Sequence, residues 1–296
     1  MKGNIEKGYF HICTDGNSLP WMFQDDEDFI VGINRIGVCS IKTKIEVITF
    51  VLMDNHVHFV LYGSMPDCKD FITLYKRLTG KWILIKYGIG NYLHGLPTEI
   101  IRMESEESIL NTIAYIDRNP LIAGYRYMPG EYPWGSSRYL FRDKENMDRR
   151  SHKGEKFISA YTRREQISIL KSNIIVPDNW KVNEVGMLDP SSFIDIEKLE
   201  SFYKTPIRYS YFLAKKLEGV VEHEMRHSQK TFIADKELRI IVAELAKENF
   251  GNSDIRGLKV NERLSIAKTL RYSYASSIKQ ISRMLYLERT ALEGFI

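Results

Sequence analysis

The sequence has few cysteines, and their placement excludes two common classes of cysteine-stabilised protein. The 296 residues include three cysteines, Cys13, Cys39 and Cys68, which lie far apart and form no CxxC arrangement. Disulfide frameworks use an even and denser set of cysteines, and cysteine zinc sites carry closely spaced pairs. The spacing therefore argues against both a disulfide framework and a cysteine zinc site.

The sequence also lacks a long apolar run. No stretch is long enough to cross a membrane, and the first residues do not show the charged, apolar and small-residue pattern of a secretion signal. We therefore expect a soluble, cytoplasmic protein with no membrane partner. Hydrophobic residues make up 44% of the chain, which is enough for one large core or two ordinary ones.

A strong excess of either charge is missing as well, since the net charge is only +4. The charges are unevenly distributed, however. Residues 201–296 carry 17 Lys and Arg against 11 Asp and Glu, a balance of +6, whereas residues 1–200 carry the remaining 25 and 27, a balance of −2. The skew suits a tail that binds nucleic acid, although on charge alone a solvated helical face is the simpler interpretation.

Strand patterns in the first part of the chain predict an α+β fold. Residues 9–14 alternate in the manner of a short strand. Residues 44–62 form the strongest β pattern, an apolar run that Asp54-Asn55 interrupts. The interruption predicts a hairpin of two strands.

Helix patterns alternate with these strands. Apolar residues at helical spacing predict helices over 25–37, 71–85 and 108–118. Gly37 is a plausible stop for the first of them, and Pro120 would end the last.

The rest of the chain divides into two parts. The pattern over 142–233 is irregular, and we predict a linker or helical region there. Residues 234–296 are clearly helical by pattern, and Ser277-Ile-Lys-Gln280 fits a capping box within them. The α+β part then occupies residues 1–141.

A pair of histidines in the apolar hairpin is the sharpest chemical feature. His56 and His58 are two apart on a strand, so their side chains project from the same face. Two adjacent imidazoles can share a divalent metal ion. A bare His-x-His pair is more often two half-exposed histidines on an open sheet, but burying polar rings in so apolar a strand has a cost unless something binds them.

A tyrosine and an asparagine form the second feature. Tyr115 and Asn119 are four apart and lie on one face of the predicted helix. A tyrosine hydroxyl can attack a phosphodiester, and an amide oxygen can be a hard metal ligand. Alone, such a pair is more often a core aromatic residue and a helix cap.

Together these segments resemble the single-tyrosine HUH transposases of the IS200-like insertion-sequence family, and most of all the REP-associated tyrosine transposase branch. Leu52-Met-Asp-Asn-His-Val-His-Phe-Val-Leu resembles the family's His-hydrophobic-His strand, with Asp54 in place of the usual proline. Tyr115 to Gly124 matches its catalytic helix. Tyr132-Pro-Trp-Gly-Ser-Ser-Arg-Tyr139 resembles its Tyr-Pro-Trp-Ser-Ser signature, with a glycine in one serine position. The resemblance covers about residues 8–141.

The resemblance implies a ferredoxin-like antiparallel sheet with helices on one face, followed by an all-α C-terminal region. It further implies that His56, His58 and Asn119 hold Mg²⁺ or Mn²⁺. Tyr115 would cleave single-stranded DNA next to a hairpin through a 5′-phosphotyrosine intermediate and rejoin it to another 3′-OH. The protein would act as a monomer or a homodimer.

Basic residues are candidates for DNA contact. Seven of them lie on predicted helices: Lys76, Arg77, Lys81, Arg118, Lys279, Arg283 and Arg289. Trp82 and Tyr87 are candidate stacking rings, although a core position is the better interpretation of Trp82. Residues 234–296 also look like a helix-turn-helix, whose last helix would start near Arg289 and be short. The competing interpretation is a structural helical bundle with solvated charges.

Two other functions stay open. A metal-dependent hydrolase would use the histidines to activate water, with Tyr115 structural. A non-catalytic regulator derived from a transposase would bind hairpin DNA without cleaving it. The complete set of His56, His58, Tyr115 and Asn119 favours the transposase.

Overall fold

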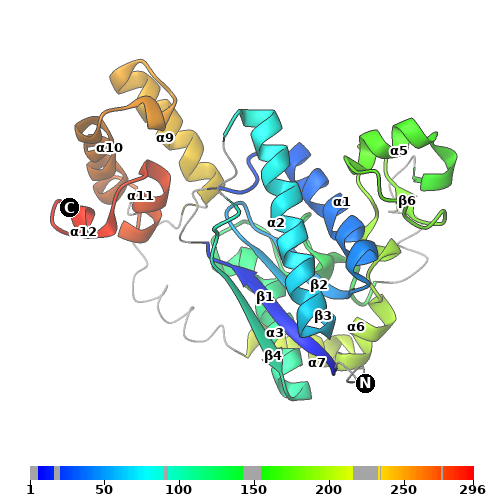
Figure 1. Ribbon diagram of the computed structural model, residues 1–296. Coiled ribbons are helices and arrows are strands. Elements are labelled where there is room, and N and C mark those ends of the chain that lie inside the picture. Colours follow the sequence, from blue (N-terminus) through cyan, green and yellow to red (C-terminus); the bar gives the residue numbers. More distant parts are fainter. Residues whose placement is uncertain are drawn as a thin grey trace.

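A four-stranded antiparallel sheet lies at the centre of the molecule (Figure 1). The computed structural model describes residues 6–16, 21–89, 93–142, 155–215, 233, 235–274 and 276–296, without the side chains of Lys236 and Lys279. The strands are β1 (Lys7–Thr14), β2 (Glu46–Leu52), β3 (Val57–Ser64) and β4 (Thr98–Met103), in the order β2-β3-β1-β4.

The sheet contains the predicted hairpin and one strand that the sequence pattern does not predict. β2 and β3 pair with Leu52 opposite Val57, which confirms the turn at Asp54-Asn55. The additional strand, β4, pairs with β1 and places Glu99 opposite Cys13. β4 is an edge strand of six residues in which polar residues flank Ile100 and Ile101 and most side chains are at least partly exposed, so no continuous apolar run marks it.

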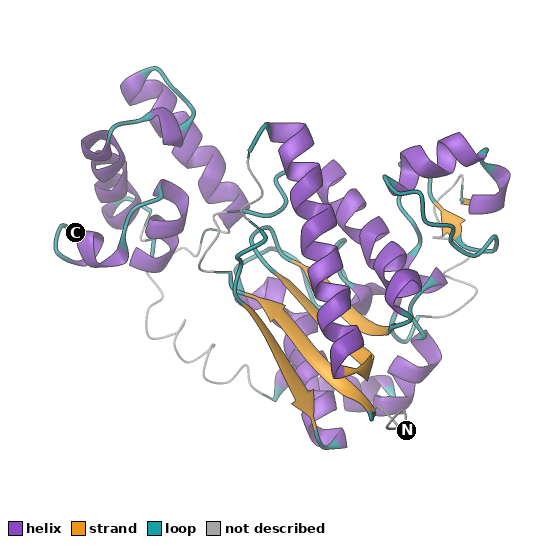
Figure 2. Cartoon of the chain, in the orientation of Figure 1, coloured by secondary structure: helices purple, strands orange, loops and turns teal. Residues whose placement is uncertain are grey.

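Two long helices, α1 (Asp26–Thr43) and α2 (Met65–Tyr87), cover one face of the sheet (Figure 2). The ring of Phe59 on β3 contacts the rings of Phe71 and Tyr75 on α2. Both helices begin at a side-chain cap, Asp25 for α1 and Ser64 for α2. The predicted helices over 25–37 and 71–85 are therefore present, and both are longer than the pattern indicates.

Gly37 does not end α1, contrary to the prediction. The helix continues to Thr43 and ends where Lys44 adopts a left-handed conformation with φ of 57°. A Cβ on Gly37 would lie 2.8 Å from the ring of Trp180. Gly37 is therefore a site of close packing against a distant segment, which its position in the sequence cannot reveal.

A third helix, α3 (Glu106–Ile122), packs on the opposite face of the sheet, together with α6 (Ile196–Tyr203) and α7 (Pro206–Ala214). Neighbouring residues on β3 point to opposite faces. Phe59 contacts α2, whereas His58 contacts Asn119 of α3. The expectation of helices on one face is therefore wrong, because α3 and α6 contact the second face of the sheet.

Pro120 lies inside α3 and does not stop it. The helix runs two residues further, to Ile122, and the N–H of Ala123 still bonds the carbonyl of Asn119 over 2.9 Å. Proline removes one backbone donor within the last turn, which neighbouring hydrogen bonds tolerate.

Residues 155–215 pack against the sheet and its helices. They contain the helices α5 (Arg163–Leu170), α6 and α7, and a two-stranded sheet of β5 (Lys156–Phe157) and β6 (Lys181–Val182). Tyr203 and Phe212 belong to the main hydrophobic core. The described part of the predicted 142–233 region is therefore not a free linker; residues 143–154 and 216–232 lie outside the description.

The last residues form a group of helices with a hydrophobic cluster of their own, seen at the left in Figure 1. These helices are α9 (Asp235–Phe250), α10 (Val260–Tyr272), α11 (Ile278–Leu285) and α12 (Arg289–Glu293). Short 3-10 turns occur between α9 and α10 at Ile255–Gly257, and earlier in the chain at Ser136–Tyr139, Ile158–Ala160 and Pro190–Ser192. No helix in the described part of the chain is both long and apolar enough to cross a membrane.

The predicted capping box at Ser277 is only half formed. The Ser277 hydroxyl accepts a hydrogen bond from the backbone N–H of Gln280 over 3.2 Å. The Gln280 side chain does not return this bond, since it donates to the Ile233 carbonyl and to Asp235, each over 2.8 Å. Gln280 instead links α11 to the beginning of α9.

Candidate functional site

The two predicted histidines lie at the start of β3, one before the strand and one within it. His56 is the last residue of the turn between β2 and β3, and His58 is the second residue of β3. Their ring centroids are 4.9 Å apart, and the rings are inclined at 84°. His58 is buried and His56 is half-buried. The two imidazoles are therefore neighbours, although only His58 belongs to the strand.

The turn before His56 fixes the orientation of its ring. The Asn55 amide Nδ2 donates to the Gly16 carbonyl over 2.8 Å, which leaves Asn55 Oδ1 2.7 Å from His56 Nδ1. Because Oδ1 can only accept, His56 carries its proton on Nδ1 and a lone pair on Nε2. A Cβ on Gly16 would lie 2.8 Å from His56 Nδ1, so this packing requires glycine.

The helix α3 brings Tyr115 and Asn119 to the histidines. The Asn119 amide Nδ2 donates to His58 Nε2 over 3.2 Å. The Tyr115 ring centroid is 5.6 Å from that of His58, and 41% of Tyr115 is exposed to solvent. The four residues singled out from two distant sequence motifs therefore meet in one place, with the tyrosine facing solvent.

A third histidine, His11 on β1, lies against His58. Its Nε2 is 3.2 Å from His58 Nδ1, and the planes of the two rings are nearly parallel, at 14°, with centroids 5.4 Å apart. Because Asn119 donates to Nε2 of His58, the ring proton of His58 is on Nδ1 and is donated to His11. Such a bond on the far side of a ligand imidazole holds its orientation and tautomer.

Burial keeps all three imidazoles neutral. It lowers the pKa of His11 and of His56 to about 4 and holds the pKa of His58 well below its usual range. His56 and His58 therefore each have a ring-nitrogen lone pair at neutral pH. Two neutral imidazoles with an amide form a donor set that fits a divalent cation, and it accepts zinc as well as Mg²⁺ or Mn²⁺.

Sequence reasoning missed two residues beside His58, namely His11 and Cys13. The alternation over residues 9–14 places both on one face of β1, and this was the available signal. The ligand atoms of His11, Cys13 and His58 all lie within 4.8 Å of one another. Burial and the carboxylate of Glu99 raise the pKa of the Cys13 thiol to about 11, so without a metal it is a poor nucleophile.

The second sequence signature, Tyr132 to Tyr139, runs along the outer edge of β2. Tyr132 donates its hydroxyl hydrogen to the Leu52 carbonyl over 2.9 Å, and the Leu52 N–H bonds the Trp134 carbonyl over 2.9 Å. The Ser136 hydroxyl accepts from the N–H of Phe50 over 2.9 Å. This segment therefore supports the strand that leads into the histidine turn and covers its free edge.

Arg118 does not have the exposure that a phosphate contact requires. Its side chain is 3% exposed, and its guanidinium donates to the carbonyls of Phe212 and Leu213 over 3.1 and 3.4 Å. Both carbonyls belong to the last turn of α7, where a cation is favoured. The predicted DNA contact is therefore wrong for Arg118, which joins α3 to α7.

The basic side chains of α2 lie across the sheet from the histidines. Lys76 donates to the Leu96 carbonyl over 2.8 Å and to Thr98 over 3.1 Å, so its charge is used within the protein. Arg77 and Lys81 are exposed. Because α2 packs on the face opposite His58, the three do not line the same face as Tyr115.

The two candidate stacking rings at the end of α2 are both tied to one carboxylate. Trp82 donates to Asp28 over 2.8 Å, and the Tyr87 hydroxyl donates to Asp28 over 2.7 Å. Trp82 is also packed against the main core. The core interpretation of Trp82 is therefore confirmed, and neither ring presents a free stacking face on the side of the histidines.

The basic residues of the tail differ in their surroundings. Arg289 is exposed at the start of α12, which has five residues, so the last helix is as short as predicted. Arg283 forms an ion pair with Asp235, and the side chain of Lys279 lies outside the described part. Arg283 is near enough to His56 to contribute to lowering its pKa. The tail therefore borders the histidine turn.

Asp54 forms a direct contact between the histidine turn and the tail. Its carboxylate is buried and forms an ion pair with Arg239 of α9. Its backbone carbonyl accepts hydrogen bonds from the N–H groups of Met22 and Phe23. The aspartate that stands where the resembled family has proline thus joins the last helices to the histidine turn.

Asp117 is a buried carboxyl group between Tyr115 and Asn119 in sequence, on the far side of α3. The Tyr209 hydroxyl donates to it over 2.7 Å, and burial raises its pKa to about 7. A carboxyl group whose pKa is raised by folding stabilises the protein at low pH, and this contribution is lost as the pH rises toward 7.

We expect Asp117→Asn to remove this pH-dependent loss of stability, since asparagine resembles the neutral carboxyl group. Relative to the parent protein, the variant should gain about 2 kcal/mol in free energy of unfolding between pH 5 and pH 7. Urea denaturation of both proteins at several pH values measures the difference, in which the histidine contributions cancel. A difference that does not change with pH would show that Asp117 is ionised throughout.

Comparisons of the chain with protein-family models, with curated proteins and with solved structures find no match.

Proposed function

We propose that the chain is a metal-dependent single-stranded DNA transposase or endonuclease of the single-tyrosine HUH type, acting beside DNA hairpins. The convergence of His56, His58, Tyr115 and Asn119 carries the proposal. The Asn119 amide lies 3.2 Å from His58 Nε2, and the Tyr115 and His58 ring centroids are 5.6 Å apart. A nucleophile at the edge of a cation-binding donor set is an arrangement suited to phosphodiester cleavage.

The order of the secondary structure supports the same proposal. The first six elements run β-α-β-β-α-β, and the sheet has the order β2-β3-β1-β4. We assign this arrangement to the ferredoxin-like type that the resemblance implies. α3 is then an additional helix that carries Tyr115, and α9 to α12 form the all-α C-terminal region.

Tyr115 supplies the nucleophile in the proposed reaction. The Tyr115 oxygen attacks the phosphorus as its phenol proton leaves to solvent, and the bond to the 3′ oxygen breaks. The leaving 3′ oxygen takes up a proton from solvent, so the products are a 5′-phosphotyrosine and a strand that ends in a 3′-OH. Attack by another 3′-OH reverses the step, rejoins the DNA and returns the proton to Tyr115.

His56, His58 and Asn119 are the residues that would hold Mg²⁺ or Mn²⁺. A bound cation would polarise the scissile phosphate and stabilise negative charge on the leaving oxygen. The protein orients the two imidazoles before binding, because Asn55 fixes the ring of His56 and His11 fixes that of His58. The Asn119 amide has to turn its oxygen toward the cation, since its Nδ2 donates to His58 Nε2.

The test is to trap the covalent intermediate. The full chain is incubated with Mn²⁺ and a labelled single-stranded DNA that contains a hairpin, and the mixture is run on a denaturing gel. We expect a labelled band at the mass of protein plus DNA. Free 5′-phosphate ends without such a band would support a metal-dependent hydrolase, and binding without cleavage would support a DNA-binding regulator.

Removing a metal ligand should abolish cleavage without abolishing the fold. We expect His56→Ala to lower the cleavage rate by at least about 100-fold, and a chelator to have the same effect on the parent protein until Mn²⁺ is restored. His56 is the better target because it is half-buried, whereas His58 is packed in the sheet. His94, a histidine distant in sequence from the motifs, provides a control variant, His94→Ala. Equal cleavage by His56→Ala and His94→Ala would contradict the assignment.

A further inference from the structure

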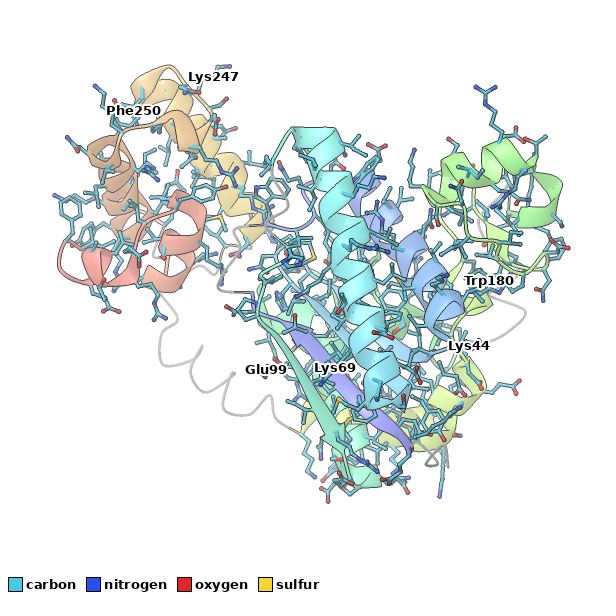
Figure 3. The ribbon with its side chains drawn as sticks, in the orientation of Figure 1. Lys44, Lys69, Glu99, Trp180, Lys247 and Phe250 are labelled. Carbon is cyan, nitrogen blue, oxygen red and sulfur yellow. The ribbon has the colours of Figure 1, made fainter. Side chains whose placement is uncertain are left out.

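A row of chemically reactive side chains crosses three strands of the sheet. Cys13 on β1 is directly opposite His58 on β3 and directly opposite Glu99 on β4, which is labelled in Figure 3. Residues directly opposite in antiparallel strands project from the same face. His11, two residues from Cys13 on β1, projects from this face as well.

The spacing within the row suits a tetrahedral metal ion. Two nitrogen ligands of zinc, each about 2.0–2.1 Å from the ion, are about 3.4 Å apart. His11 Nε2 and His58 Nδ1 are 3.2 Å apart, and one ligand atom each of His11, Cys13 and His58 lies within 4.8 Å of the other two. The sulfur therefore has to move by roughly 1 Å toward the nitrogens, which is within the range of a side-chain rotation. Glu99 Oε2, 3.9 Å from the sulfur, supplies a fourth donor.

We propose that His11, Cys13, His58 and Glu99 form a zinc site, which differs from the proposed Mg²⁺ or Mn²⁺ site but shares His58 with it. A thiol and two imidazoles are soft donors that select zinc over Mg²⁺ or Mn²⁺. Zinc binding converts the Cys13 thiol to a thiolate, and the thiol proton passes to solvent. The donors come from adjacent strands of a hydrogen-bonded sheet, so their backbone positions are fixed before the ion binds. Zinc binding also requires the His58 proton to move from Nδ1 to Nε2 and the Asn119 amide to turn its oxygen toward Nε2.

The two sites share His58 through opposite nitrogens of its ring. A neutral imidazole has one proton, which must sit on the nitrogen that does not bind metal. A cation at Nε2, beside Asn119, needs the proton on Nδ1, whereas zinc at Nδ1 needs the proton on Nε2. Occupation of one site by His58 therefore excludes the other. Zinc should inhibit DNA cleavage by this route, and this part of the inference rests on the proposed function.

Metal binding is tested first, without DNA. The full chain is titrated with Co²⁺, which reports thiolate ligation by an absorption band, and with Zn²⁺ against a chelating dye. We expect one equivalent of either ion and a thiolate band. Cys13→Ser should lose the band and weaken zinc binding on the order of 100-fold. Cys68→Ala removes a buried cysteine of α2, which packs on the opposite face of the sheet from His58. This variant should keep both the thiolate band and the zinc affinity. Absence of a thiolate band from the parent protein would overturn the site.

Inhibition is tested second, with the cleavage assay. Zinc should abolish Mn²⁺-dependent cleavage by the parent protein and should inhibit Cys13→Ser only at about 100-fold higher concentration. Equal zinc sensitivity of the two proteins would overturn the sharing of His58. If the parent protein does not cleave DNA at all, the proposed function fails, and the Co²⁺ and Zn²⁺ titrations still decide whether the zinc site exists.

Discussion

Replacing Tyr115 by phenylalanine should abolish the covalent protein–DNA product and lower strand cleavage by at least about 10³-fold, because the variant lacks the attacking oxygen. The fold should not change. Tyr115 is 41% exposed, and phenylalanine keeps the ring that lies against His58 and His11. The free energy of unfolding should therefore remain within about 0.5 kcal/mol of the parent value.

The measurement combines the denaturing gel with a binding assay on the same hairpin DNA. We expect Tyr115→Phe to bind the DNA as well as the parent protein does. Tyr211→Phe is a matched control, since Tyr211 is another exposed tyrosine, on α7. Cleavage by Tyr115→Phe at the parent rate would leave the tyrosine without a catalytic role and would favour activation of water beside the histidines.

Replacing Arg239 by methionine should produce the largest loss of stability, about 3 kcal/mol or more. Arg239 forms an ion pair with Asp54, whose side chain is only 5% exposed. Removing one partner of such a pair leaves a buried charge without compensation. The parent and variant can be compared by urea denaturation followed by tryptophan fluorescence, because all four tryptophans precede residue 181 and report on the sheet part of the chain.

A second substitution separates the ion pair from other effects of Arg239→Met. Adding Asp54→Asn removes the stranded carboxylate and should restore part of the lost stability. The exposed Arg289 provides the control, since Arg289→Met should change the free energy of unfolding by no more than about 0.5 kcal/mol. If Arg239→Met behaved like this control, the contact between the tail and the histidine turn would not contribute to stability.

Local patterns predicted the elements of the sheet part well, and contacts between distant segments account for the errors. The hairpin around Asp54-Asn55 and the helix that brings Tyr115 near His58 follow from short-range periodicity. β4 was missed because an edge strand has no continuous apolar run. Gly37 was misread because its ring neighbour, Trp180, is far away in the sequence.

The same difference between local patterns and contacts of distant segments applies to the residues of the candidate site. His56, His58, Tyr115 and Asn119 were found because each pair is close in sequence and carries its own spacing. His11 was missed because its significance depends on the register between β1 and β3, which no local pattern fixes. Arg118 was misassigned because a cation next to a nucleophile suggests a phosphate contact, whereas the carbonyls of α7 that it binds are 94 and 95 positions away.

The contact between Asp54 and Arg239 can form only late in the synthesis of the chain. The two residues are 185 positions apart. At roughly 5–20 residues per second, a ribosome needs about 10 to 40 seconds to add that length of chain. During this interval the strands, the histidines and Tyr115 have all been made, but the carboxylate beside the histidine turn still lacks its cation. The ion pair beside the histidine turn can therefore form only after the last helices have been made, and a chain that stalls before them has this buried carboxyl group without its partner.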